Sequence, residues 1–290
     1  MVDWEKYPDF LEAAKESNAL SLEGFFGERT KELTLKREFI DQKDFFSTCI
    51  DDWLSDVNQY GKDEVKKLIF LFIKLYSESI QASGQEAIDA LSSFMTGLPE
   101  NPETECLSSF TEFLRLHVEI NNVLQQTKQM QTNTIAARKR LGVSISNAYS
   151  KGVELISKIL SVCITLMELA NGKSPNQLQT YNLFLWKKSQ KYEELSAGKY
   201  DEILYSIDRG IRNAEAHLNL VFVPDRGSFK YKVKSGKKYK TKEISAEQFL
   251  LDKYMKIGWV SQGFIYSALL TIIAHLDQEL FKTKMKQIYS

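Results

Sequence analysis

The stretch SISNAYSKGVELISKILSVCITLMELAN, residues 144–171, decides the fold class expected for this chain. Its apolar residues recur three or four positions apart, which is the period of an α-helix with one broad buried face. The other long segments between turn signals show the same spacing, and the whole chain has only five prolines. The sequence therefore predicts a mainly α protein.

Further helices are expected on both sides of this stretch. Before it, we expect helices at about 4–17, 33–59, 63–83, 85–94 and 104–137, with a loop at 96–103. After it, we expect helices at about 177–197, 200–218 and 246–284. Together with residues 144–171, these last three make four long helices, enough for a four-helix bundle.

A domain boundary is predicted at Leu141-Gly142, just after Arg138-Lys139-Arg140. It separates an N-terminal helical domain, residues 1–141, from a C-terminal domain, residues 142–290. Up to Met130 there are 24 Asp/Glu against 13 Lys/Arg, and from Gln131 onward 14 against 25. This asymmetry indicates a polyanionic partner for the second half. The acidic first half is either an ordinary solvated domain or a cover that keeps the basic half inactive until a trigger arrives.

Several other classes of protein are disfavoured by the sequence. Cys49, Cys106 and Cys163 are odd in number and lack CxxC or Cys/His spacing, so neither a disulfide framework nor a zinc site is expected. The N-terminus, MVDWEKYPDF, does not resemble a secretory signal. The most apolar stretches, residues 68–73 and 153–170, are too short or contain charges. We therefore expect a cytoplasmic chain with no cofactor, no metal and no membrane contact.

One segment breaks the helical spacing, residues 220–244 (LVFVPDRGSFKYKVKSGKKYKTKEI). Apolar or aromatic residues alternate with lysines on both sides of Ser235-Gly236, which predicts a β-hairpin. From Arg226 to Lys242 there are eight Lys/Arg and no Asp or Glu. Lysines on edge strands often serve only to prevent aggregation. The interleaved aromatics favour contact with nucleic-acid phosphates and bases instead.

The residues predicted to bind RNA share a basic or aromatic side chain in this segment: Arg226, Lys230, Lys232, Lys234, Lys237, Lys238, Tyr239, Lys240 and Lys242.

A short motif with four polar residues, RNAEAH, lies at residues 212–217, just before the hairpin. Cleavage of RNA by its own 2′-hydroxyl needs a base to take that proton, an acid for the leaving oxygen, and a cation to offset the charge on the phosphorane-like transition state. Histidine as a residue type titrates near neutrality, so His217 is a candidate base or acid, and Arg212 offers a permanent charge with a fork that fits phosphate oxygens. These groups require no metal.

The spacing of this motif restricts how it can act. Arg212 and His217 are five positions apart, so a regular helix rotates one from the other by about 140°. Asn213 and His217 are four apart and share a face. Convergence of all three groups therefore requires either a loosened helix end or a second subunit that brings its own motif to the same cleft. The second solution predicts a homodimer with a composite site.

A helical bundle with an Arg-polar-x-x-x-His motif late in its third long helix resembles the HEPN superfamily. The resemblance covers about residues 142–290. It implies a HEPN-like four-helix bundle with the basic hairpin inserted, in which Arg212 and His217 are catalytic and Asn213 orients the site. Many active members are metal-independent endoribonucleases that work as dimers in toxin–antitoxin, abortive-infection and CRISPR-associated defence systems. The implied partners are RNA, a second copy of the chain and an inhibitory or activating protein.

One position departs from part of that family. The HEPN toxins paired with nucleotidyltransferase antitoxins extend the motif to His-x-Tyr, whereas Asn219 stands two residues after His217 here. Regulation through modification of such a tyrosine is therefore not expected.

Three other interpretations stay open. Asp208 and Arg212 can form an i,i+4 surface pair, with His217 serving only as a cation near the helix end. The chain can be a non-catalytic RNA-binding or dimerisation scaffold with a HEPN-like bundle. It can also be a regulatory subunit whose acidic half docks on a basic partner.

Overall fold

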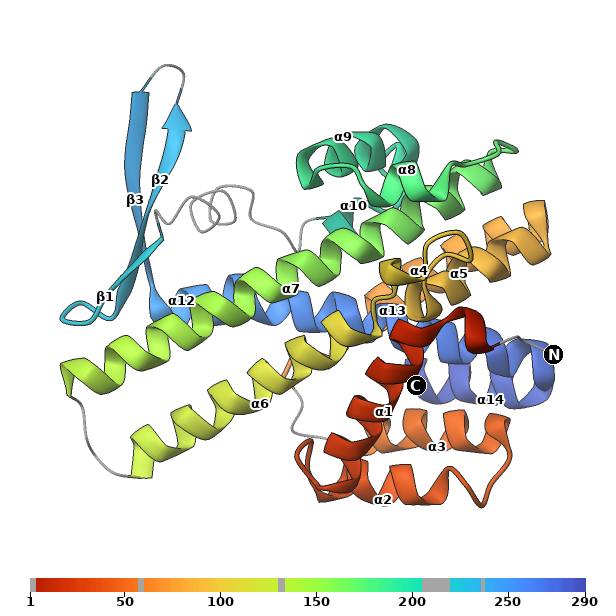
Figure 1. Cartoon of the computed structure of the whole chain (residues 1–290), viewed down its shortest axis with the longest axis horizontal. Helices are drawn as coiled ribbons and strands as arrows, with labels where there is room; N and C mark the ends of the chain where they lie inside the picture. Colours follow the sequence, from red (N-terminus) through yellow and green to blue (C-terminus); the bar gives the residue numbers. More distant parts are fainter. Residues whose placement is uncertain (1–3, 57–59, 130–133, 205–219, 236–237) are drawn as a thin grey trace. The chain divides into compact units, whose positions relative to one another are not determined.

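A computed structural model describes residues 4–56, 60–129, 134–204, 220–235 and 238–290, and these residues are mainly helical (Figure 1). The predicted fold class, mainly α, is confirmed at this level.

The elements follow one another in a simple order. The first helices are η1 (Trp4–Lys6), α1 (Pro8–Leu22), α2 (Glu28–Lys36), α3 (Gln42–Ser55), α4 (Lys62–Ser83), α5 (Gln85–Thr96) and η2 (Pro102–Thr104). The middle helices are α6 (Leu107–Gln129), α7 (Ile135–Ala170), α8 (Gln177–Tyr181), α9 (Leu185–Ser196) and α10 (Asp201–Leu204). The last part has β1 (Val221–Val223), β2 (Ser228–Ser235), β3 (Lys238–Ser245), α12 (Ala246–Phe249), the π-helix η3 (Leu250–Tyr254), α13 (Met255–Leu276) and α14 (Gln278–Tyr289).

The chain forms two compact units, each assembled from separate segments. Unit 1 contains Met1–Ser108, Ser157–Leu204 and Trp259–Ser290. Unit 2 contains Ser109–Ile156 and Tyr205–Gly258. The predicted boundary at Leu141-Gly142 lies inside α7, and each unit combines segments from both predicted domains.

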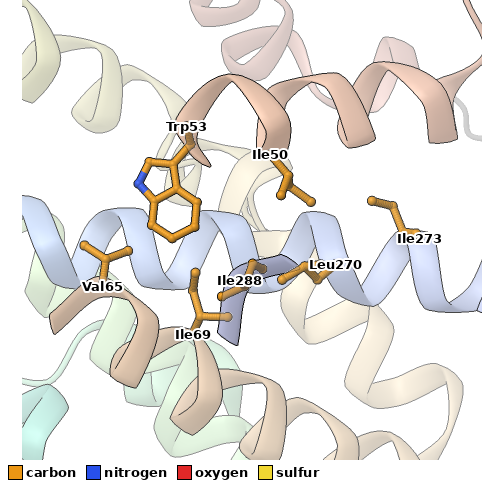
Figure 2. Close-up of a cluster of buried hydrophobic side chains, with 7 residues drawn as sticks. All are labelled: Ile50, Trp53, Val65, Ile69, Leu270, Ile273 and Ile288. Carbon is orange, nitrogen blue, oxygen red and sulfur yellow. The ribbon is translucent and has the colours of Figure 1, made fainter. Parts of the chain in front are cut away.

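The core of unit 1 is built by helices from the two ends of the chain. Figure 2 shows seven buried side chains of α3, α4, α13 and α14 pointing toward one another: Ile50, Trp53, Val65, Ile69, Leu270, Ile273 and Ile288. The Trp53 indole also stacks on the Tyr266 ring, with centroids 5.0 Å apart. Burying each aliphatic side chain of this size contributes about 1.5–3 kcal/mol. The last two helices are therefore integral to the fold of unit 1.

Helices α4 and α13 approach closely inside this unit. A Cβ at Gly263 would lie 2.7 Å from Leu68 Cβ, so only glycine permits the approach. The Ser267 hydroxyl donates to the carbonyl oxygen of Ile69 at 3.2 Å, and the Tyr76 hydroxyl to that of Phe264 at 3.3 Å. These bonds satisfy polar groups that the close approach buries.

The stretch Ala246–Leu276 is long and apolar enough to cross a membrane by length and composition alone. From Trp259 onward, however, it belongs to unit 1 and supplies Leu270 and Ile273 to the buried core. A core helix passes the same test, and this packing explains the composition.

Several predicted helices are divided in the structure, and the predicted bounds are wrong there. The helix expected at 33–59 is two helices, α2 and α3, and the one expected at 177–197 is α8 and α9. The helix expected at 246–284 is interrupted at Asp277, which adopts an extended conformation and accepts a hydrogen bond from the Leu280 backbone N–H at 3.0 Å. A side-chain cap of this kind starts a new helix although the apolar spacing continues across it.

The helical part of unit 2 brings α6, α7 and the start of α13 together. A Cβ at Gly152 would lie 2.9 Å from the Phe113 ring and 2.7 Å from Ile257 Cγ2, so glycine allows these side chains to reach the α7 backbone. Nearby, Nδ1 of His117 lies 2.9 Å from the Tyr254 hydroxyl. Burial lowers the pKa of His117. This histidine therefore serves as a neutral hydrogen-bonding group in the unit.

Candidate nucleic-acid interface

The three predicted catalytic residues, Arg212, Asn213 and His217, lie outside the described residues. The described residues before this gap end at Leu204, the last residue of α10, and those after it begin at Leu220, just before β1. The catalytic assignment therefore stays a prediction from sequence. The predicted RNA-binding segment, in contrast, is mostly described.

This segment forms a three-stranded antiparallel sheet in the order β1-β2-β3 (Figure 1). Strands β2 and β3 pair from Ser228↔Ser245 at the base to Ser235↔Lys238 at the far end. The pairing of β1 with β2, from Val221↔Lys230 to Val223↔Ser228, adds a strand that the sequence pattern did not predict. Register assigns side chains to faces, because directly paired residues point to the same side.

One face of the sheet is apolar at its base and fixes the sheet within unit 2. Phe229 is fully buried, with its ring centroid 5.0 Å from Phe222 and 4.5 Å from Phe249. Phe249 in turn contacts Tyr149 of α7, at 5.1 Å between centroids. Because Ile244 pairs with Phe229, it lies on this same face and is also buried. A chain of aromatic contacts therefore joins the strands to α7.

The beginning of α7 contacts the sheet directly. A Cβ at Gly142 would lie 2.3 Å from the Phe222 ring, and Arg138 donates from Nη1 to the Pro224 carbonyl oxygen at 3.2 Å. Residues 138 and 142 are one helical turn apart and share a face. Lys139 lies on the flank of that face and Arg140 on the opposite side, and both are exposed. In the sequence these basic residues marked only the expected boundary.

The opposite face carries an acidic residue at its base that the sequence pattern did not reveal. Glu243 pairs with Lys230 across the strands, 3.9 Å from its Nζ, and accepts from Arg226 Nη1 at 3.4 Å. The Ser228 hydroxyl also donates to it at 2.5 Å. This hydroxyl, with Lys230 and Arg226 beside it, holds the pKa of the Glu243 carboxyl below its ordinary value. Arg226 and Lys230 are therefore paired at the base of the sheet.

The signal for this pairing was available in the sequence. Glu243 is the residue directly after the window from Arg226 to Lys242, which contains no acidic residue. A β-hairpin centred on Ser235-Gly236 brings the two ends of the segment side by side. A charge at one end can therefore pair with a charge at the other. Arg226 and Lys230 therefore have a counter-charge that the absence of acidic residues between Arg226 and Lys242 did not indicate.

The outer part of the sheet remains strongly basic. Lys232, Lys238, Lys240 and Lys242 are exposed, and none of them forms an ion pair within the described part of the chain. Tyr239 is 68% exposed, a high value for a ring that has a hydrophobic face to bury. The side chain of Lys234 and the whole of Lys237 lie outside the described residues.

The cations are distributed over both faces of this ribbon. Register places Lys238, Lys240 and Lys242 on the face of Tyr231, and Lys232 and Tyr239 on the other. Three lysines at every second position of β3 are separated by about 7 Å from one to the next. Such a row can contact successive phosphates, and the exposed Tyr239 on the other face, near Lys232, can stack on a base.

No cluster of three or more His, Cys, Asp or Glu side chains suited to a metal ion occurs in the described ranges. Comparison with protein-family models, with curated proteins and with solved structures finds no match for this chain.

Proposed function

We propose that this chain is a metal-independent endoribonuclease of the HEPN type, acting as a homodimer in the cytoplasm. Arg212 and His217 carry out the cleavage, and Asn213 orients them. The basic sheet that follows the motif holds the RNA. Bacterial defence, as a toxin or an abortive-infection effector, is the role that this activity would serve.

One observation carries the proposal, the position of the sheet directly after the motif. Only residues 218–220 separate His217 from β1, and the outer part of β2 and β3 presents Lys232, Lys240 and Lys242 without counter-charges among the described residues. A cation and a histidine suited to phosphodiester chemistry are thus followed by a surface suited to a polyanion. The motif and the basic surface are both suited to RNA as the substrate.

The same basic surface also supports a second function, one that does not depend on the 212–217 motif. The exposed lysines and Tyr239 are sufficient for RNA binding, so a non-catalytic RNA-binding or dimerisation scaffold needs nothing more. This alternative differs in its dependence on His217. Binding would persist, and no biological effect would require the imidazole.

Growth arrest after induced expression distinguishes these functions in cells. The endoribonuclease is expected to stop growth and to lose that effect in His217→Ala at equal protein level. Total RNA from arrested cells should show new cleavage products that the variant lacks. Equal arrest by wild type and His217→Ala would reject the catalytic assignment, and arrest by neither would favour the scaffold if both proteins bind RNA in vitro.

A further inference from the structure

A small cavity with a mainly apolar wall and a few polar side chains lies within unit 1. Its lining residues are distant in sequence from the basic sheet. It has a volume of about 30 Å³, is partly open to solvent, and is lined by α5, α7, α8 and the segment between α5 and α6. About 10–15 Å³ of such space holds one water molecule, so this cavity accommodates about two waters or one compact ion.

The lining supplies hydrogen-bond donors and no carboxylate. Lys158, Thr165, Gln177 and Tyr181 all border the cavity, and no Asp or Glu does. Thr165 is 3% exposed, and its hydroxyl has no hydrogen-bond partner within the part of the chain that the structure describes. Thr165 lines the cavity, so a water molecule or a ligand there can hydrogen-bond with its hydroxyl. Burial raises the pKa of Tyr181, so its hydroxyl keeps its proton and can donate.

The charges around the cavity favour a negative occupant. Lys188 is 4% exposed, and its Nζ lies 5.4 Å from the centroid of the Tyr181 ring. It donates to the backbone and hydroxyl oxygens of Ser157, both at 3.2 Å, and no carboxylate lies within ion-pair distance of it among the described residues. A buried ammonium group held only by neutral acceptors gains from a nearby anion.

The other charged groups nearby each have at least one partner, although the buried Oε2 of Glu168 has none among the described residues. Lys158 donates to the Glu105 carbonyl oxygen at 3.2 Å. The Glu105 carboxylate is buried and accepts from the Ser108 backbone N–H at 3.0 Å. Glu168 forms an ion pair with Lys191 at 2.9 Å. Neither carboxylate lines the cavity, but Glu105 is close enough to act electrostatically on the lining residues Tyr181 and Cys106. At Cys106 the charge of Lys158 acts in the opposite direction.

We propose that this cavity binds one compact monovalent anion of the size of chloride or bromide. The Lys158 ammonium group and the hydroxyls of Thr165 and Tyr181 are its ligands, and Lys188 contributes long-range attraction. The site is independent of RNA binding and of the 212–217 motif, and it stabilises unit 1.

Bromide is the probe for this site, in the full-length protein. The melting temperature is measured in increasing sodium bromide against sodium gluconate at equal ionic strength, because an ion that binds only the folded state raises it with concentration. Crystals grown in bromide are expected to show one anomalous peak within hydrogen-bonding distance of Lys158 and Thr165.

Thr165→Val removes one ligand at nearly constant volume and no hydrogen bond within the described structure. It is expected to weaken bromide binding several-fold without lowering stability in gluconate. Thr271→Val is the matched control, since the Thr271 hydroxyl donates to Ser267 in its own helix at 2.8 Å, and it should leave bromide binding unchanged. A melting temperature independent of bromide overturns the proposal, as does an anomalous peak without concentration-dependent stabilisation.

Discussion

The buried ammonium group of Lys188 has a measurable consequence for stability. Desolvation, with Lys158 nearby, lowers its pKa from 10.5 to about 8. Between these two pH values the unfolded chain keeps a proton that the folded chain has released, so stability rises with pH across this window. At neutral pH the folded state bears the full cost of the buried charge.

Lys188→Met is therefore expected to stabilise unit 1 at pH 7 by about 2 kcal/mol. The Ser157 carbonyl oxygen still accepts from Ser161 at 3.1 Å, so the change leaves it satisfied. The gain should shrink from pH 8 upward and vanish above about pH 10.5, as measured by urea denaturation. A decrease in stability at pH 7, or a gain that does not depend on pH, would contradict this account of Lys188.

Glu243 is predicted to limit the affinity of the sheet for RNA. Glu243→Gln removes the charge that faces Arg226 and Lys230, while the amide can still accept from Ser228. Single-stranded RNA should bind more tightly, with a steeper dependence on salt, because two cations become available to phosphates. Fluorescence anisotropy at several salt concentrations measures both quantities. Unchanged affinity would show that the base of the sheet lies outside the RNA path.

At the scale of elements, β3 is the strand on which the RNA-binding prediction depends. Replacing Lys238, Lys240 and Lys242 together by Ser should weaken RNA binding at least tenfold and lower the salt slope by about 0.7 for each phosphate that the strand no longer neutralises. If these lysines serve only to protect an edge strand, RNA binding stays and the variant aggregates instead. Anisotropy and light scattering on the same samples separate these outcomes.

Two neighbouring basic residues at the start of α7, Lys139 and Arg140, allow matched charge reversals that test which side of the helix contacts RNA. Lys139 flanks the face of α7 that contacts the sheet, whereas Arg140 lies on the opposite side. Lys139→Glu should weaken RNA binding more than Arg140→Glu, although both make the same change in net charge. Equal effects would mean that RNA responds to total charge and not to this surface.

The sequence predicted the elements whose apolar residues recur at one regular spacing, either every second position or every third to fourth position. The helices at 63–83 and 85–94 closely match α4 and α5, which have strong apolar spacing and end at glycines. The breaks at Asp277 and between α8 and α9 were missed because apolar spacing continues on both sides, and a cap depends on local backbone geometry. The partnership of Glu243 with Arg226 required the register of the strands, which composition alone does not provide.

At the scale of the whole molecule, unit 1 depends on packing between the first and last helices. Ile69→Ala, in the cluster that joins α3, α4, α13 and α14, should destabilise the protein by about 2–5 kcal/mol. Thermal unfolding measures the decrease. A change below about 1 kcal/mol would mean that this cluster does not hold the C-terminal helices in place.

The composite site of the proposed homodimer predicts complementation between two inactive variants. If Arg212 of one subunit works with His217 of the other, an Arg212→Ala/His217→Ala heterodimer retains one intact site. Co-expression with random pairing should then restore about a quarter of wild-type activity, because half of the dimers have one of two sites. No recovery in verified heterodimers would place both groups of each site in one subunit.

Cleavage of RNA by purified protein tests the central claim most directly. Wild type and His217→Ala, purified in parallel and free of contaminating nuclease, are incubated with a labelled single-stranded RNA in EDTA, and the products are resolved on a denaturing gel. The account predicts cleavage by wild type in the absence of metal and a rate at least a hundredfold lower in the variant, since removing an acid–base group costs about 10²–10⁴ in rate. Cleavage by His217→Ala at the wild-type rate would contradict it.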